Sequence, residues 1–344
     1  MSLNLQSHTI SQRKSLKLKG TKTSVTKNQL LISTGIVSLD AVLDGGIPIG
    51  TVALIEDESH GRNADLVTKH FIAEGVVCDH SIIIADIEKK PEAIANDLPK
   101  PIQEESFQPT DSIAEDFKIA WRYRQNPIQD SKPHHTSISF GHTFDISAKI
   151  PVDELQNVGY WPNEESESLS YYNLLKNLNT IITSGGFSTK FPVEKRRALR
   201  ITISNLHSPL WDTEGMDVVT FLYKLRILVR SSYATCLVTY QGAHIFDDMV
   251  KCRMEHFVDT VLIFKPIELS SCVDYNGKLI IGKLASFNTF LYEPLSVDWA
   301  TKLTRKRLCI EKLHLPPCLN NGDDNENAHT KQLACSSTTS VLNF

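Results

Sequence analysis

The chain has 344 residues, of which 41% are hydrophobic and 22% are charged, so it is long enough to bury the core of one large domain or two ordinary ones. Its formal net charge of -4 excludes the strongly basic overall charge typical of many nucleic-acid-binding proteins. Any basic binding face must therefore be local. The seven cysteines are scattered and have no metal-ligand spacing, which indicates a reducing compartment. The chain has no apolar run long enough for a membrane span, and its start lacks the apolar core of a signal peptide. These features predict a soluble, intracellular protein with no membrane partner.

The two ends of the chain have the composition of disordered segments. Residues 1–28 contain six basic side chains and no acidic one, with little periodicity, which predicts a disordered basic arm. Residues 318–344 are rich in Asn, Asp, Ser and Thr and are predicted to form a disordered tail. One folded domain is therefore expected between them, at 29–317.

Short apolar runs alternate with helical patterns through this domain. Continuous apolar strands are buried on both faces, as in a parallel sheet, and five such runs occur, at 51–55, 81–85, 200–203, 236–239 and 260–264. Apolar residues at helical spacing over 171–182 and 218–229 predict helices that cover the sheet. The pattern favours an α/β fold with a mostly parallel twisted sheet flanked by helices.

Two further segments modify this scheme. Asn276 and Gly277 lie between strand-like runs, a strong hairpin signal, so the sheet is expected to end in antiparallel strands near the C-terminus. The stretch around 99–166 fits the alternation poorly, because it is rich in proline and carries an acidic patch. It is predicted to be a long, partly ordered insertion.

Residues 54–66 lie between an apolar strand and a helix, where a nucleotide-binding protein has its phosphate loop. Such a loop reads G-x-x-x-x-G-K-[ST], because the glycines let backbone amides surround phosphate oxygens, the lysine neutralises charge and the hydroxyl binds magnesium. In the register set by the strand, the positions with these roles are occupied by Asp57, Arg62, Asn63 and Ala64. The carboxylate of Asp57 is expected to repel the β- and γ-phosphates of a nucleotide.

A second nucleotide-binding element is altered in the same way. The magnesium aspartate of such enzymes ends an apolar strand, and here that position is Ser204. The two losses predict that the chain has no catalytic residue and no cofactor. An alternative of a different class stays open, an active ATPase in which Arg62 replaces the lysine and a neighbouring subunit completes the site. A binding protein unrelated to nucleic acid is a third reading.

The residues around the altered loop resemble a known family. The stretch Gln29–Asp40, followed by Leu43–Gly50 and the strand, is similar to the opening of a RecA-like ATPase core of the S-T-G-x-x-x-L-D-x-x-L-x-G-G type. Five further blocks occur in order: Phe71–Gly75, Lys118–Tyr123, Phe140–Asp145, Leu206–Trp211 and Lys312–Pro317. Together they resemble the PAXNEB family, which comprises the fourth subunit of the Elongator complex, and the resemblance runs from about Gly20 to Pro317.

The resemblance implies a RecA-like subunit of Elongator without an active site of its own. Elongator modifies the wobble uridine of certain tRNAs to 5-carboxymethyl-type derivatives. Three related RecA-like subunits would form a hetero-hexameric ring, two copies of each, so the implied partners are two paralogues, the other Elongator subunits and tRNA bound by the assembled ring. Such a subunit is expected in the cytoplasm and the nucleus.

Several polar residues are candidates for binding sites. His134, His135, His142 and Asp145 lie in a polar stretch without regular ligand spacing, so no metal site is predicted. Five basic residues are tentative tRNA contacts: Lys195, Arg196, Arg197, Lys251 and Arg253. The first three precede a strand, where a solvated basic run is the usual explanation.

Overall fold

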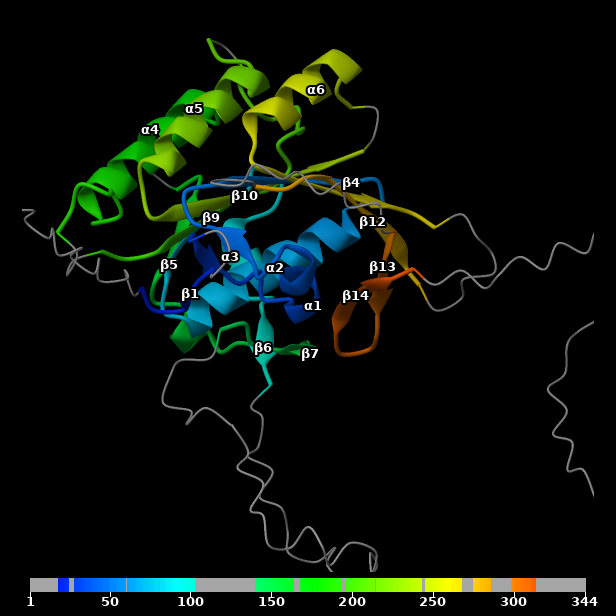
Figure 1. The fold of residues 1–344 in the computed structure, drawn as a ribbon. Coiled ribbons are helices and arrows are strands. Elements are labelled where there is room, and N and C mark those ends of the chain that lie inside the picture. Colours follow the sequence, from blue (N-terminus) through cyan, green and yellow to red (C-terminus); the bar gives the residue numbers. More distant parts are fainter. Residues whose placement is uncertain are drawn as a thin grey trace, which may run out of the picture. The chain divides into compact units, whose positions relative to one another are not determined.

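The computed structural model describes the residues of ten segments, 18–24, 28–59, 61–102, 140–163, 168–192, 196–213, 215–242, 245–267, 275–285 and 298–313. All described helices and strands belong to one compact unit, Met1–Leu313 (Figure 1). The expected arm before residue 18 and the expected tail at 318–344 lie outside the described residues. Within the described segments, no helix has the length and apolar character needed to cross a membrane.

A nine-stranded sheet forms the centre of this unit, in the order β8-β5-β9-β10-β4-β11-β12-β13-β14. The first six strands in that order are parallel: β8 (Val158–Trp161), β5 (Ser81–Ala85), β9 (Leu199–Ile203), β10 (Ala234–Gln241), β4 (Val52–Asp57) and β11 (Thr260–Lys265). The last three are antiparallel to their neighbours: β12 (Gly277–Lys283), β13 (Trp299–Leu303) and β14 (Leu308–Lys312). This confirms the expected mostly parallel sheet with antiparallel strands near the C-terminus.

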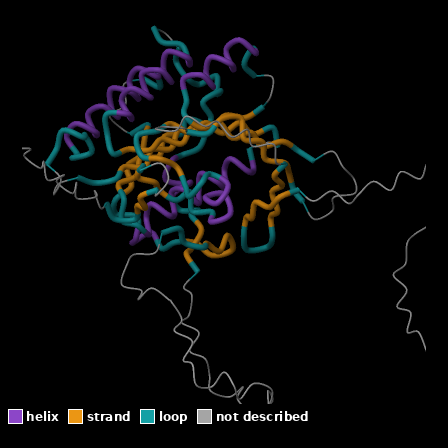
Figure 2. Tube along the Cα trace, in the orientation of Figure 1, coloured by secondary structure: helices purple, strands orange, loops and turns teal. Residues whose placement is uncertain are grey.

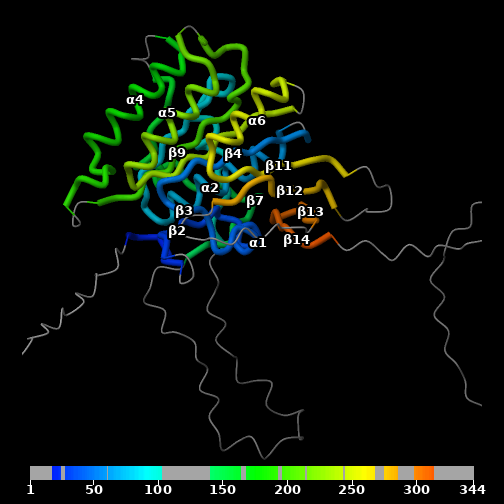
Figure 3. Tube along the Cα trace, turned by 45° about the horizontal axis from the view of Figure 1, so that its top comes forward, coloured from blue at the N-terminus to red at the C-terminus, as the bar shows by residue number. Residues whose placement is uncertain are grey.

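Helices cover both faces of the sheet (Figure 2). One face carries α4 (Tyr171–Ser184), α5 (Val218–Arg230) and α6 (Asp248–Phe257), which lie side by side (Figure 3). The other carries α1 (Val37–Val42), α2 (Arg62–Val77) and α3 (Pro91–Ala95). Two small sheets accompany the second face: one joins β1 (Thr21–Thr23), β2 (Leu30–Ile32) and β3 (Ile47–Pro48), and the other joins β6 (Pro99–Pro101) and β7 (Phe144–Lys149).

The continuous apolar strands are explained by cores on both faces. In β4, Val52 and Leu54 pack into the core beneath α4, α5 and α6, whereas Ala53 and Ile55 pack into the core on the side of α1 and α2. Neighbouring strand residues point to opposite faces, so both sets of positions must be apolar. Two of the helices begin at a side-chain N-cap: the side chain of Ser170 accepts from the Asn173 amide before α4, and Asp217 accepts from the Thr220 amide before α5.

Some boundaries differ from the sequence-based expectations. Thr21–Thr23, within the expected basic arm, forms β1 and pairs with β2. Part of the stretch expected to be an insertion belongs to the main sheet, because β8 pairs with β5 there. A 3-10 helix, Val152–Glu154, precedes β8. Gly277, at which a hairpin turn was expected, begins β12, and β12 pairs with β11 on one side. Residues 268–274, which precede the expected turn, lie outside the described segments.

Candidate functional site

The degenerate phosphate loop lies where the sequence predicts it, between β4 and α2. The strand ends at Asp57, two residues beyond the end of the predicted run, and the helix begins at Arg62. Gly61 precedes the helix with φ of 76°, in the left-handed region that favours glycine. A Cβ at Gly61 would lie 2.4 Å from the Gln241 side chain. Gln241, the last residue of β10, therefore lies directly against the loop.

The carboxylate of Asp57 accepts hydrogen bonds from within the loop itself. One oxygen accepts from the Ser59 amide at 2.8 Å and from the Ser59 hydroxyl, and the other accepts from the Ala64 amide at 2.8 Å. Asn63 supports the arrangement, because its side-chain amide donates to the Ser59 hydroxyl oxygen at 2.8 Å. Asp57 is fully buried. Free amides at a helix N-terminus attract anions, and here the protein's own carboxylate takes that place.

The other two loop positions contribute no phosphate chemistry in this arrangement. Ala64 is buried and carries no hydroxyl, and the side chain of Arg62 is exposed. The backbone of Asp57 is also engaged, since its carbonyl accepts from the Gly242 amide at 3.0 Å. The loop is thus held closed by contacts to its own residues and to the end of β10.

Ser204, at the degenerate magnesium position, is buried directly after β9. Its amide donates to the Ala85 carbonyl at 2.9 Å, and the next residue, Asn205, has a positive φ of 54°. The Asn205 side chain donates to both oxygens of Asp86 at 3.2 Å and accepts from Gln241. A polar cluster therefore spans the carboxyl ends of β5, β9 and β10, where open parallel sheets bind ligands.

Sequence reasoning missed Asp86, although it directly follows the predicted strand at 81–85. Its carboxylate accepts from the amides of Glu88 and Lys89 at 2.8 and 3.0 Å. Burial raises the pKa of this carboxyl above its usual value. Because its oxygens are bonded to backbone amides and to Asn205, Asp86 shapes the turn after β5.

A pocket of about 200 Å³ opens beside Ser204 between α2 and α3. Two ion pairs flank it, Lys69 with Asp97 and Lys89 with Asp65. Its walls therefore have balanced charge, whereas a nucleotide phosphate site needs an excess of positive charge.

The five tentative tRNA contacts do not form one surface. Lys195 lies outside the described residues. Arg196 is tied to its own loop, because its guanidinium donates to the Phe191 carbonyl at 2.9 Å and lies over the ring of Tyr233. Lys251 forms an ion pair with the fully buried Glu56. Only two of the described candidates, Arg197 and Arg253, have exposed side chains without such anchoring, one before β9 and the other on α6.

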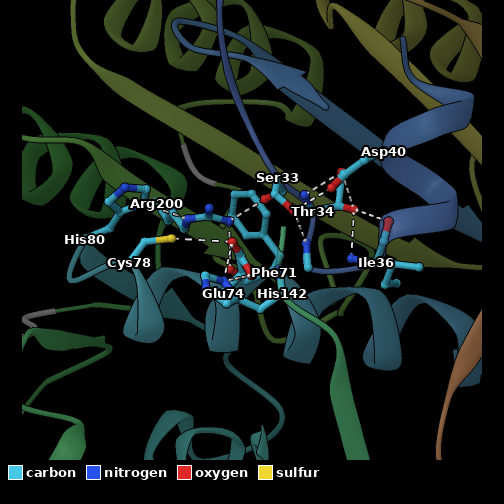
Figure 4. Close-up of polar contacts among 11 residues, drawn as sticks. Ser33, Thr34, Ile36, Asp40, Phe71, Glu74, Cys78, His80, His142 and Arg200 are labelled. Atoms are coloured by element: carbon cyan, nitrogen blue, oxygen red, sulfur yellow. Dashed lines mark hydrogen bonds and ion pairs between the residues drawn. The ribbon is translucent and has the colours of Figure 1, made fainter. Parts of the chain in front are cut away.

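A buried ionic network joins the family-like blocks on the α2 face (Figure 4). The guanidinium of Arg200, on β9, is fully buried and donates to the carbonyls of Ser33 and Phe71 at 2.8 and 3.0 Å. It also donates to a ring nitrogen of His80 at 3.0 Å. The buried carboxylate of Glu74 stabilises this cation electrostatically. The network thus connects β2, α2, β5 and β9.

The S-T-G-x-x-x-L-D block forms a closed turn next to this network. The Asp40 carboxylate accepts from the Ser33 hydroxyl at 2.5 Å and from both the amide and the hydroxyl of Thr34 at 2.7 Å. Burial raises the pKa of Asp40 to about 6. Gly35 has a φ of 80°, and a Cβ there would lie 2.3 Å from the His70 carbonyl oxygen. The block therefore holds the segment before α1 against α2.

His142 joins the same network and forms the one group of metal-ligand residues among the described segments, with Glu74 and Cys78. Its backbone amide and ring Nδ1 bond to Glu74 at 3.0 and 3.1 Å, and the Cys78 thiol donates to Glu74. Burial raises the pKa of Cys78 to about 12, and the Arg200 cation lies close by. A protonated thiol and a nearby cation both oppose metal binding. His134 and His135 lie outside the described residues, and Asp145 bonds to Ser147.

The family-model and curated-sequence comparisons point to one family. The chain matches the family model of PAXNEB protein over residues 14–344. It is 33% identical to Elongator complex protein 4 of Mus musculus, over 88% of this chain and 81% of that protein, and 31% identical to the Xenopus laevis protein, over 88% and 84%. Among solved structures, a KaiC-like protein of Pyrococcus horikoshii is similar with a TM-score of 0.48 and 11% identity, over 82% of this chain and 98% of that chain. The family-model match and the identity to the vertebrate proteins show that the chain belongs to the PAXNEB family.

Proposed function

We propose that this chain is a non-catalytic subunit of the Elongator complex. In this proposal it forms a hetero-hexameric ring with two paralogous RecA-like subunits and supports wobble uridine modification of tRNA, in the cytoplasm and the nucleus. Support for the complex comes from the relatives, which carry the name Elongator complex protein 4 and align over about four fifths of their length.

The observation that carries the non-catalytic role is the closure of the phosphate loop on Asp57. Its carboxylate already accepts from the amides of Ser59 and Ala64, the donors that a phosphate would otherwise use. A nucleotide phosphate would have to displace a buried anion and approach it closely, which electrostatic repulsion opposes. The lysine, the hydroxyl and the magnesium carboxylate are replaced as well.

Exposed apolar side chains support a role in assembly. Several large ones lie on α4, α5 and α6 or just before α6, and each is at least 47% exposed: Tyr172, Tyr223, Ile227, Ile245 and Met249. Obligate subunit interfaces are more apolar than ordinary surface. This face is therefore a candidate contact with neighbouring subunits.

The direct test is reconstitution with the other Elongator subunits. We expect the chain to assemble into a particle with the mass of a hexamer, and we expect cells without it to lose wobble uridine modification while the remaining subunits persist. A chain that neither copurifies with Elongator subunits nor affects the modification would contradict the proposed function.

Restoring two loop residues should not restore catalysis. We expect Asn63→Lys with Ala64→Thr to show no magnesium-dependent ATP hydrolysis, because Asp57 still occupies the loop and Ser204 offers no carboxylate. The measurement is phosphate release by the purified chain, with and without magnesium.

A third substitution separates the effect of the Asp57 carboxylate from the effect of the missing magnesium carboxylate. Adding Asp57→Gly to the double variant should increase nucleotide binding without producing hydrolysis, since the magnesium carboxylate is still missing. Turnover by the double variant above the background of the unmodified chain would support the alternative of an active ATPase.

A further inference from the structure

The hairpin of β13 and β14 carries a concentration of positive charge that the motif analysis did not identify. Residues 299–312 contain five cations and one carboxylate, in a chain whose net charge is -4. Four of the cations lie at or next to the turn, and we call them the basic tip: Lys302, Arg305, Lys306 and Arg307.

The basic tip is held in a defined position. Across the turn, the Thr304 amide donates to the Arg307 carbonyl at 2.9 Å, and the Arg307 amide donates to the Thr304 hydroxyl at 3.1 Å. In β14, which directly follows the turn, Leu308 and Ile310 are buried in the core beneath α1 and α2. The Ile310 amide also donates to the Ser38 hydroxyl at 2.9 Å. The turn is therefore anchored to the domain by its strands.

The charges of the tip are available to a ligand. Arg305, Lys306 and Arg307 are all exposed. Lys306 lies 3.8 Å from Asp145, and because the Lys306 side chain is 65% exposed, this long pair contributes little. Arg307 also acts electrostatically on Asp145, but within the described segments no direct ion pair involves Arg305 or Arg307. By contrast, Lys251 forms an ion pair with the buried Glu56.

We propose that the basic tip binds phosphates of the RNA backbone, and this inference rests on the proposed function, in which the assembled ring binds tRNA. Exposed Arg and Lys side chains neutralise phosphates and release counterions, and Arg can donate two parallel hydrogen bonds to one phosphate. Such contacts fix the position of the nucleic acid and do not read its sequence. The tip offers a bilayer a single large apolar side chain, Leu303, which is 43% exposed, so RNA fits it better than a lipid surface.

The test compares two rings reconstituted with the partner subunits, one with the unmodified chain and one with Arg305→Gln, Lys306→Gln and Arg307→Gln. The Kd for tRNA is measured between 50 and 200 mM salt. Each lost phosphate contact lowers the salt slope by about 1, so we expect the slope to fall by about 2–3 and tRNA binding at low salt to weaken roughly 10- to 100-fold.

A matched control removes three exposed cations elsewhere, with Lys22→Gln, Lys90→Gln and Lys190→Gln. They lie on β1, before α3 and after α4, outside the basic tip and outside the three helices that carry the candidate subunit contact. The control changes the net charge equally and should leave the slope unchanged. Equal losses in both variants would mean a general charge effect and would overturn the inference.

Other outcomes separate this inference from the proposed function. If the ring binds tRNA with the same salt dependence in all three proteins, the tip inference fails and the proposed function stands. If the unmodified ring binds no tRNA, both fail. If the tip variant no longer assembles into the ring, the tip is a contact with another subunit and the inference is overturned. If the variant keeps its tRNA slope but no longer binds vesicles containing phosphatidylserine, the tip binds a membrane and the inference is likewise overturned.

Discussion

Replacing Arg200 with methionine should lower the free energy of unfolding by about 3–5 kcal/mol, because several buried acceptors lose their donor at a cost of about 1–3 kcal/mol each. The substitution removes the donors to the carbonyls of Ser33 and Phe71 and to the ring of His80. It also removes a cation that stabilises the buried Glu74 carboxylate electrostatically. Denaturant-induced unfolding, followed by circular dichroism, measures the effect.

A double variant tests how much of the loss is electrostatic. Arg200→Met with Glu74→Gln should be more stable than Arg200→Met alone, because glutamine carries no buried negative charge and its oxygen can still accept from the His142 amide. Lys224→Met on the exposed face of α5 is the surface control and should change stability by less than about 0.5 kcal/mol. An Arg200 variant as stable as this control would show that the network is not needed for the fold.

The variant Asp57→Ala should be destabilised and then rescued by anions. The substitution leaves the part-buried amide of Ser59 and the buried amide of Ala64 without an acceptor, at a cost of about 1–3 kcal/mol. Inorganic phosphate or sulfate can replace the missing carboxylate at the N-terminus of α2, and binding to the folded state alone raises Tm. We therefore expect phosphate to raise the Tm of the variant more than that of the unmodified chain.

Two controls make the rescue specific. Chloride at equal ionic strength should have no comparable effect on Asp57→Ala. Asp57→Asn, which retains one oxygen acceptor, should be less destabilised and less responsive to phosphate. If phosphate stabilises the unmodified chain as strongly as the variant, the loop still has an open anion site and the carboxylate does not fill it.

The strands and helices with continuous or periodic apolar patterns were predictable from the sequence. The runs at 51–55, 81–85 and 260–264 correspond to β4, β5 and β11. These strands pack against a core on each face of the sheet, so successive residues are apolar and the run is visible in the sequence. β8 was not identified, since Val158–Trp161 is short and includes a glycine. Its place in the sheet depends on pairing with β5, 76 positions earlier in the chain.

The roles of individual polar residues were harder to predict. A carboxylate at a glycine position of the loop indicates repulsion of phosphate, but its bonds to Ser59 and Ala64 depend on how the backbone turns at Gly61. Arg200 was not singled out by sequence reasoning, and its partners His80 and Ser33 lie 120 and 167 positions away in the chain. Contacts over such separations leave no local pattern in a single sequence.

The pairing of β6 with β7 makes the position between them a natural site for inserting foreign sequence. Lys100 lies opposite Asp145, and the Ile102 amide donates to the Thr143 carbonyl at 2.8 Å, so residues 102 and 143 lie at neighbouring points of the fold. Strand pairing holds these two points together. Doubling the length of a flexible loop costs only about 0.6 kcal/mol in closure entropy, so a flexible insert adds little to the cost of closing it. A fluorescent domain or an affinity tag can therefore be spliced in here while the rest of the domain keeps its stability.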